Sequence, residues 1–336
     1  AREQVADLIG SRPAEIIFTA SGTESDNLAI LGTLAANPDK RHILTTAVEH
    51  EAVWRLCQRL EHDDYEVTYV GVDQLGRLDE DAFAAALRDD TAIASVMHAN
   101  NETGVLFPIE RLAMIAAERG APLHVDAVQT AGKLPIDVGS MPVAMLSLSS
   151  HKMHGPMGAG VLYLRRGQRI RPMFTGGHQE HDLRAGTENL VAIVGLGAAA
   201  AMASRMDEAE PGRIRALRDR LERGLLERVN FAHVNGDPRQ RVFNTTNIGF
   251  ETLEADAVVI ALSENGICAS AGAACASGSL EASHVLKAMG IPEAIAHGGV
   301  RFSLSRFTTD AEIDEAIARI PPLVSRMRKL LPHVLA

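Results

Sequence analysis

Short apolar runs alternate with amphipathic segments through the first 165 residues of the chain. Compact runs rich in β-branched residues predict strands, and apolar residues spaced three or four positions apart predict helices between them. The predicted strands lie at 15–19, 42–46, 66–70, 92–97, 122–126, 145–149 and 160–165. The predicted helices lie at 1–9, 24–36, 52–63, 79–87 and 109–119. This alternation predicts an α/β fold, with a mostly parallel sheet that carries helices on both faces.

The pattern changes after residue 206. A long charged helix is predicted at 214–228, and mixed strands and helices follow it. Pro211 and Gly212 are expected to interrupt the chain just before this helix. A chain of 336 residues has room for one large and one smaller domain, and we expect these at 1–206 and 207–336. Because the chain opens inside a predicted helix, we also expect a segment to precede it.

The charge balance and the apolar runs argue against two classes of partner. The chain has 33 basic and 43 acidic residues, a net charge of −10, and no basic block interleaved with aromatic residues. This composition argues against a nucleic acid partner. No run approaches the roughly 20 apolar residues of a membrane span, so no membrane partner is expected.

The three cysteines, Cys57, Cys268 and Cys275, form no Cys-x-x-Cys pair. This argues against a disulfide framework and a structural zinc site, and it favours a reducing, cytoplasmic location. Cys57 falls in an amphipathic helix and Cys268 in a strand-like run, so both are expected to be buried. Cys275 lies in a run of small residues, GAACASGS, a composition that suits a flexible loop.

Polar residues gather where the predicted strands end, which is where doubly wound sheets bind ligands. Taken singly, each of them is explained more simply as a helix cap or a solvated surface residue. As an ordered set they are the residue types that pyridoxal phosphate requires: a lysine for a Schiff base, an aspartate for the pyridinium nitrogen, and a helix N-terminus for the phosphate. The set is Thr23, His50, Asn101, Asp126, Gln129, Ser149, His151 and Lys152.

Seven motifs carry a family resemblance over nearly the whole chain. They are SGTES at 21–25, HANNETG at 98–104, HVDAVQ at 124–129, SSHK at 149–152, RAGTEN at 184–189, GAACAS at 272–277 and VRFSLSR at 300–306. The chain resembles the cysteine desulfurases of the class V aminotransferase family, in particular the type that serves iron–sulfur assembly in nitrogen fixation. The resemblance implies fold type I of the pyridoxal-phosphate enzymes, with a seven-stranded sheet, a smaller α+β C-terminal domain and a homodimer.

The resemblance also implies a role for each residue that would touch the cofactor. Lys152 would form the Schiff base, Asp126 would face the pyridine nitrogen, and Gln129 would face the ring hydroxyl. His50 would stack on the ring and relay protons. The phosphate would be bound by residues of three motifs, with one contribution from the neighbouring subunit. These residues are Gly22, Thr23, Ser149 and His151, with Thr187 from the neighbouring subunit.

For the substrate, L-cysteine, the resemblance implies that Arg301 and Asn101 hold the carboxylate. Cys275 would attack the substrate sulfur, keep it as a persulfide, and pass it to an iron–sulfur scaffold or another acceptor protein. No intrinsic metal is implied, although the persulfide could contact a cluster on a partner. Two alternatives stay open: another reaction of the same fold, such as selenocysteine lysis or transamination, and an inactive scaffold.

Two departures from the family pattern are visible. An opening segment like Leu-Asp-Asn-Asn-Ala-Thr is missing, and GHQEHDLR at 177–184 is less basic than in the family. Neither departure touches the lysine, the aspartate or the cysteine.

Overall fold

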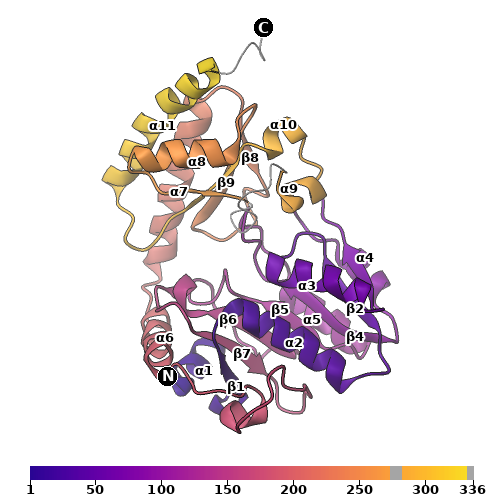
Figure 1. Cartoon of the computed structure of the whole chain (residues 1–336). Helices are drawn as coiled ribbons and strands as arrows, with labels where there is room; N and C mark the ends of the chain where they lie inside the picture. The colour runs from indigo at the N-terminus through magenta and orange to yellow at the C-terminus, as the bar shows by residue number, and fades with distance from the viewer. Residues whose placement is uncertain (273–281, 331–336) are drawn as a thin grey trace. The chain divides into compact units, whose positions relative to one another are not determined.

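The computed structural model describes residues 1–272 and 282–330 (Figure 1). They divide into two units. The first comprises Ala1–Gly71, Leu78–Asn100 and Phe107–Met206. The second comprises Val72–Arg77, Asn101–Leu106 and Asp207–Ala336. The main division falls after Met206, and two short segments from the first 206 residues belong to the second unit.

The first unit is built on a seven-stranded sheet with the strand order β1-β7-β6-β5-β4-β2-β3. The strands are β1 (Ile16–Thr19), β2 (His42–Thr46), β3 (Glu66–Val70), β4 (Thr91–Met97), β5 (Leu123–Asp126), β6 (Met145–Ser149) and β7 (Gly160–Leu164). β7 runs antiparallel to both of its neighbours, and the remaining pairings are parallel. Six strands therefore share one direction, and their carboxyl ends meet at one edge of the sheet.

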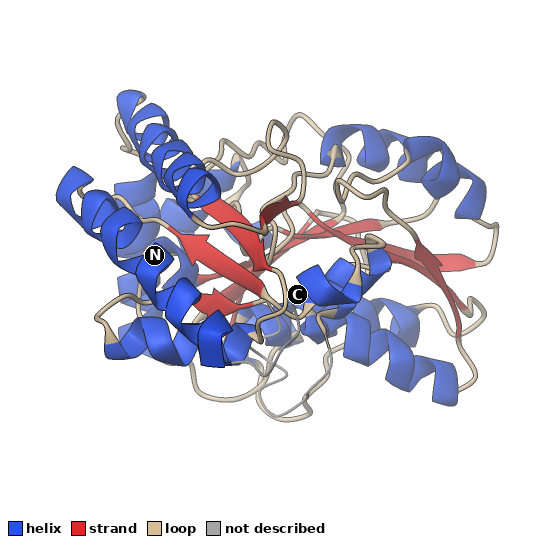
Figure 2. Ribbon diagram, turned by 90° about the horizontal axis from the view of Figure 1, so that it is seen from above, coloured by secondary structure: helices blue, strands red, loops and turns tan. Residues whose placement is uncertain are grey.

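Helices cover this sheet. They are α1 (Arg2–Ile9), α2 (Gly22–Ala36), α3 (Glu51–His62), α4 (Glu80–Ala86), α5 (Ile109–Glu118) and α6 (Leu190–Ala203), with short 3-10 helices η1 (Pro13–Glu15), η2 (Ser150–Met153) and η3 (Gln179–Asp182). Every residue of β2, β4, β5 and β6 is buried. This is expected of strands that have helices on both faces, and helices lie on either side of the strands in Figure 2.

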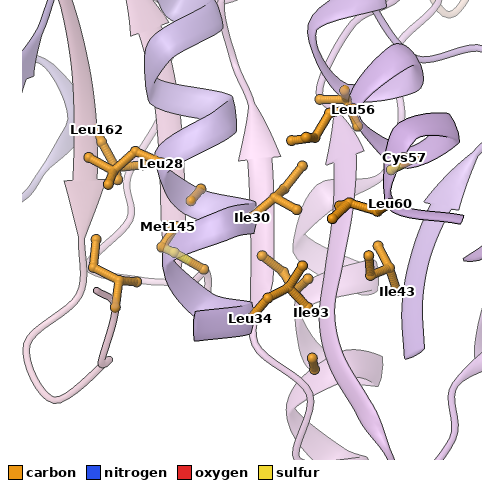
Figure 3. Packing of buried hydrophobic residues seen from close by; sticks show 14 of the residues in the cluster. Leu28, Ile30, Leu34, Ile43, Leu56, Cys57, Leu60, Ile93, Met145 and Leu162 are labelled. Carbon is orange, nitrogen blue, oxygen red and sulfur yellow. The ribbon is translucent and has the colours of Figure 1, made fainter. Parts of the chain in front are cut away.

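The apolar core beneath α2 and α3 holds the sheet in register. Leu28, Ile30 and Leu34 of α2 lie in one buried cluster with strand residues such as Ile93 and Leu162 (Figure 3). Leu56, Cys57 and Leu60 of α3 complete the same cluster. Most of these residues are less than 5 % exposed, so the start of α2, which lies beside the strand ends, is fixed to a rigid support.

The second unit contains a four-stranded antiparallel sheet with the order β10-β11-β9-β8. Its strands are β8 (Ala232–Asn235), β9 (Thr245–Phe250), β10 (Ser270–Ala271) and β11 (Gly299–Ser303). Its helices are α7 (Ala209–Arg228), α8 (Ala255–Glu264), α9 (His284–Ala288), α10 (Glu293–Ala296) and α11 (Asp310–Leu330).

One expectation about the start of this unit was wrong. Pro211 and Gly212 lie inside α7, which begins at Ala209 and not at residue 214. Pro211 occupies the third position of the helix, where a backbone N–H would have no partner inside the helix, so proline costs little there.

Candidate active site

The ends of neighbouring strands bring several predicted site residues together in the first unit. Asp126 is the last residue of β5, and Ser149 is the last residue of β6. Lys152 follows at once in η2. His50 caps α3 shortly after β2, and Gly22 opens α2 after β1. These predicted site residues therefore lie along the edge of the sheet at which the parallel strands end.

A cradle for an anion lies where α2 meets the end of β6. A Cβ atom on Gly22 would lie 2.7 Å from Cγ2 of Val128 and 3.5 Å from Cβ of Ser149, so glycine permits this close approach. Ser149 Oγ is 2.9 Å from Nδ1 of His151. Thr23 is exposed in the first turn of the 15-residue helix. The N–H groups of that turn, with the hydroxyl and imidazole beside them, fit a phosphate group.

The carboxylate of Asp126 is buried, and His50 and Lys152 lie close enough to act on it. Its Oδ1 accepts a hydrogen bond of 2.9 Å from the backbone N–H of Val128. Burial raises the pKa of Asp126, while His50, the Val128 N–H and Lys152 act to lower it. A buried carboxylate with a raised pKa favours a hydrogen-bonded cationic partner. The pyridinium N–H of pyridoxal phosphate is such a partner, so the residues present fit this group.

Two further carboxyl groups, on Asp26 and Glu49, lie in the same buried region, and sequence reasoning missed both. Burial, with Asp126 and Glu49 nearby, raises the pKa of Asp26 well above its usual value. Burial also raises the pKa of Glu49 to about 8. Asp26 lies four residues after Gly22 on the buried face of α2. This spacing of one helical turn is the sequence feature that could have placed Asp26 beside the predicted site.

His50 is held by its own helix and by the turn before it. Its Nδ1 accepts a 3.1 Å hydrogen bond from the backbone N–H of Ala52, which places the proton of the neutral ring on Nε2. The Nδ2 group of Asn100 donates to the carbonyl of Val48 at 3.0 Å. The imidazole is therefore oriented by the backbone at the end of the sheet, as a ring that stacks on a cofactor requires.

Gln129 and Thr187 also lie in the first unit. Gln129 is half-buried three residues after Asp126, and its carbonyl accepts a 2.8 Å hydrogen bond from Nζ of Lys133. Thr187 is exposed in the loop that begins at Arg184. The Nε of Arg184 donates to Oε1 of Glu24 at 2.8 Å, which ties this loop to the first turn of α2. A contact between Thr187 and a neighbouring subunit stays a prediction.

Asn101 and Arg301 belong to the second unit, in which they lie together. Arg301, on β11, donates from Nη1 to the carbonyl oxygen of Asn101 at 2.6 Å. The side-chain Oδ1 of Asn101 is buried and has no hydrogen-bond partner among the described residues. Buried acceptors of this kind are paired in most native proteins, with protein groups or ordered water.

The structure describes two of the three cysteines, and one of these two differs from its predicted burial. Cys275 lies outside the described residues. Cys57 is buried as predicted, and burial raises the pKa of its thiol to about 12. Cys268 is exposed, so the prediction that it is buried was wrong. Its segment joins α8 to the two-residue strand β10 and is not itself part of a strand.

Within residues 1–272 and 282–330, no helix combines the length and the apolar character that a membrane crossing needs. Over the same ranges, no three side chains of histidine, cysteine, aspartate or glutamate are grouped so that they could bind a metal ion.

The aminotransferase class-V family model matches residues 1–316 of the chain. Cysteine desulfurase 2 of Trichormus variabilis is 53% identical over 332 residues, which are 99% of this chain and 83% of that protein. Cysteine desulfurase NifS of Azotobacter vinelandii is 52% identical over 334 residues, with the same two coverages. A solved structure titled "NIFS-LIKE PROTEIN" superposes with a TM-score of 0.90 at 35% identity and covers 97% of this chain and 86% of its own. These similarities and the seven-stranded sheet confirm the predicted fold class.

Proposed function

The chain belongs to the aminotransferase class-V family and is a cysteine desulfurase, and we propose that it converts L-cysteine to L-alanine with pyridoxal phosphate bound at Lys152 and a persulfide formed on Cys275. The observation that carries the proposal is the buried Asp126 carboxylate, with His50 and Lys152 near enough to lower its pKa. This arrangement suits a cationic aromatic ring bound between the lysine and the aspartate.

Residues from four strand ends would hold the cofactor. The N-terminus of α2, with Gly22, Thr23, Ser149 and His151, would bind the phosphate. Asp126 would pair with the ring nitrogen, Gln129 would donate to the ring oxygen, and His50 would stack on the ring. Thr187 of a second copy would add a phosphate contact. When bound, pyridoxal phosphate would withdraw electrons from the substrate Cα and so ease the loss of its proton.

The protein groups would do the remaining work. Arg301 and Asn101 would hold the substrate carboxylate, and Lys152 Nζ would take the Cα proton. The Cys275 thiolate would attack the substrate sulfur, so that an S–S bond forms while the Cβ–S bond breaks. The electron pair of the broken bond stays with carbon, Cβ gains a proton, and Lys152 Nζ returns a proton to Cα, which gives alanine. Cysteine and the enzyme thiol thus become alanine and an enzyme persulfide, with atoms and electrons balanced.

The persulfide would pass to an acceptor protein, and an iron–sulfur scaffold in the cytoplasm, as used in nitrogen fixation, is the acceptor that we propose. A homodimer is supported by the exposed apolar face of α6. That face presents Leu190, Val191, Val194 and Met202, and Met157 nearby is exposed as well. A second copy of this chain is the occupant that we propose for it, because Thr187, the proposed contact to a neighbouring subunit, lies three residues before the first residue of this helix.

The test is a borohydride reduction of the purified protein, followed by peptide mapping. We expect a visible absorption band that is lost on reduction, and a pyridoxyl group on Lys152. A label on another lysine, or a protein that stays colourless after addition of pyridoxal phosphate, would overturn the proposal. Cys275→Ser should abolish sulfide release from cysteine. Sulfide release that persists in this variant would instead favour a selenocysteine-lyase type of reaction.

A further inference from the structure

Glu102 is a buried carboxylate in the second unit that the proposed reaction does not use. It follows Asn101 in the HANNETG motif, in the short segment 101–106 that belongs to this unit. Its side chain is 2 % exposed. Its Oε2 accepts a 2.6 Å hydrogen bond from Oγ of Ser283. Its backbone carbonyl accepts a 3.3 Å hydrogen bond from Nδ2 of Asn247 on β9. Burying a carboxylate is costly unless it is paired and hydrogen-bonded, so this position calls for an explanation.

The same carboxylate oxygen also lies against the backbone of Gly272. A Cβ atom at Gly272 would lie 2.3 Å from Oε2 of Glu102, so a side chain at residue 272 would displace this carboxylate from its position. Gly272 directly follows the two-residue strand β10, and its N–H donates to the carbonyl of Gly299 at 3.2 Å. The absence of a side chain at residue 272 therefore lets the carboxylate reach a backbone that is already fixed to the sheet.

Gly272 and Ser283 stand on either side of residues 273–281, the segment that includes Cys275. Ser283 is fixed in turn, because its Oγ accepts hydrogen bonds from the backbone N–H groups of Val285 and Leu286 at the start of α9. The Glu102 carboxylate thus contacts both flanks of the segment that includes Cys275, the residue proposed to take sulfur from the substrate.

We propose that Glu102 is a positioning residue for sulfur transfer, whose carboxylate fixes both flanks of the Cys275 segment to the turn that carries Asn101. The inference rests on the proposed function of Cys275. Asn101, the next residue, receives the Arg301 hydrogen bond at its carbonyl, and these two residues are proposed to hold the substrate carboxylate. The adjacent residues Asn101 and Glu102 therefore connect the groups proposed to hold the substrate cysteine with the two flanks of the Cys275 segment.

This link predicts a selective defect. A displacement of about 1 Å between two reacting groups can lower a rate by about 100-fold, while binding of the substrate is little changed. Loss of the Glu102 carboxylate should therefore lower kcat and the rate of persulfide formation. It should leave KM for cysteine and the cofactor absorption near their wild-type values, because neither depends on the Cys275 segment.

The experiment compares Glu102→Ala, Glu102→Gln and Ser283→Ala with the wild type, all as holoenzymes. Persulfide on Cys275 is followed by mass spectrometry in a single turnover, beside steady-state kinetics, cofactor absorption and Tm. We expect Glu102→Ala to slow persulfide formation by about 10- to 100-fold, and Glu102→Gln to lose less because its carbonyl still accepts from Ser283. Glu312→Gln is the control: Glu312 lies in the same unit and also accepts from a hydroxyl, that of Thr309 at 2.9 Å, but it is exposed, so persulfide formation should match the wild type.

Persulfide formation at the wild-type rate in Glu102→Ala would overturn the inference. A parallel loss of cofactor and of Tm in all three variants would also overturn it, because that result indicates a role in folding alone. If Glu102→Ala does not fold, the rate of persulfide formation in Ser283→Ala tests the inference. This variant removes the hydroxyl that donates to Glu102 and keeps the carboxylate. A wild-type enzyme that binds its cofactor but forms no persulfide on Cys275 would instead disprove the proposed function.

Discussion

The Nε2 atom of His124 lies 3.6 Å from Oδ1 of Asp26, with both side chains shut off from water. The imidazole also contacts Ser95 Oγ at 2.9 Å through Nδ1 and Ser147 Oγ at 2.8 Å through Nε2. Burial lowers the pKa of His124 to about 3 and raises that of Asp26 well above its usual value. Burial therefore disfavours the charged form of both side chains, which argues against an ion pair between them.

From this pair we predict that Asp26 and Asp126 respond differently to replacement by asparagine. Asp26→Asn should keep cofactor binding and kcat within about twofold of wild type, because an amide replaces a carboxyl group whose charged form is disfavoured by burial. Asp126→Asn should lower kcat by about 100-fold or more, because its charge would stabilise the protonated ring. Titration with pyridoxal phosphate and assays of alanine release measure both effects. Equal losses in the two variants would show that Asp26 is ionised.

The buried Glu49 predicts how the stability of the fold depends on pH. Burial raises its pKa from 4.5 to about 8, so the folded protein holds this proton more tightly than the unfolded chain does. The group therefore stabilises the fold fully below pH 4.5, and this contribution is lost as the pH rises to about 8. Glu49→Gln does not titrate, and it keeps an acceptor for Thr46 Oγ1 and the Met97 N–H.

The Tm of the wild type minus that of Glu49→Gln should therefore fall steadily over this pH range. Thermal unfolding of the two cofactor-free proteins in parallel buffers measures the difference. A difference that is independent of pH would mean that Glu49 is ionised in the fold.

Arg301 tests the proposed substrate site. One branch of its guanidinium donates to Asn101 O, and a lysine at this position could not keep that contact and also form a two-point bond to a carboxylate. Arg301→Lys should raise KM for cysteine by about tenfold or more, with the cofactor absorption unchanged. Arg306→Lys is the control, since Arg306 pairs with Glu210 instead. An unchanged KM in Arg301→Lys would remove Arg301 from the site.

The sequence predicted the sheet well because its strands are short apolar runs bounded by turn residues. The predicted strands at 42–46, 66–70 and 145–149 have the bounds that the structure gives them. Because parallel strands end at one edge, the polar residues that follow them could be grouped before the structure was known. The same logic placed Asp126, His50 and Lys152 together.

Long-range contacts could not be predicted in this way. β10 has two residues, and it exists because Ser270 and Ala271 pair with β11, about 30 residues further along the chain. Because the sequence does not reveal this pairing, Cys268 was predicted to lie in a buried strand. Asp26 was missed for a related reason: a polar residue on a helix is usually solvated, and its burial depends on the neighbouring strands.

The apolar face of α6 predicts the oligomeric state. Val194→Asp places a charge in the middle of the exposed apolar residues of this helix and should convert a dimer to a monomer in analytical ultracentrifugation. Met114→Asp is the control, because Met114 is an exposed apolar residue of a different helix, α5. A wild-type protein that sediments as a monomer would contradict the proposed homodimer.

The two described cysteines should differ sharply in reactivity, which affects every assay of Cys275. Cys57 is buried in the α2–α3 core with a thiol pKa of about 12, and Cys268 is exposed. Since the thiolate is the reactive form, iodoacetamide should label Cys268 in the native Cys275→Ser variant and should label Cys57 only after unfolding. Mass spectrometry of the labelled peptides decides this, and labelling of native Cys57 would contradict the buried position.

An exposed thiol can also take sulfur by exchange, so Cys268→Ser should remove background persulfide and leave sulfur transfer through Cys275 intact. Cys57→Ser should instead lower the free energy of unfolding by about 1–3 kcal/mol, because it leaves a hydroxyl in an apolar cluster, while kcat is unchanged. Denaturant unfolding and alanine release separate the two effects. Loss of sulfur transfer in Cys268→Ser would make Cys268, and not Cys275 alone, part of the sulfur path.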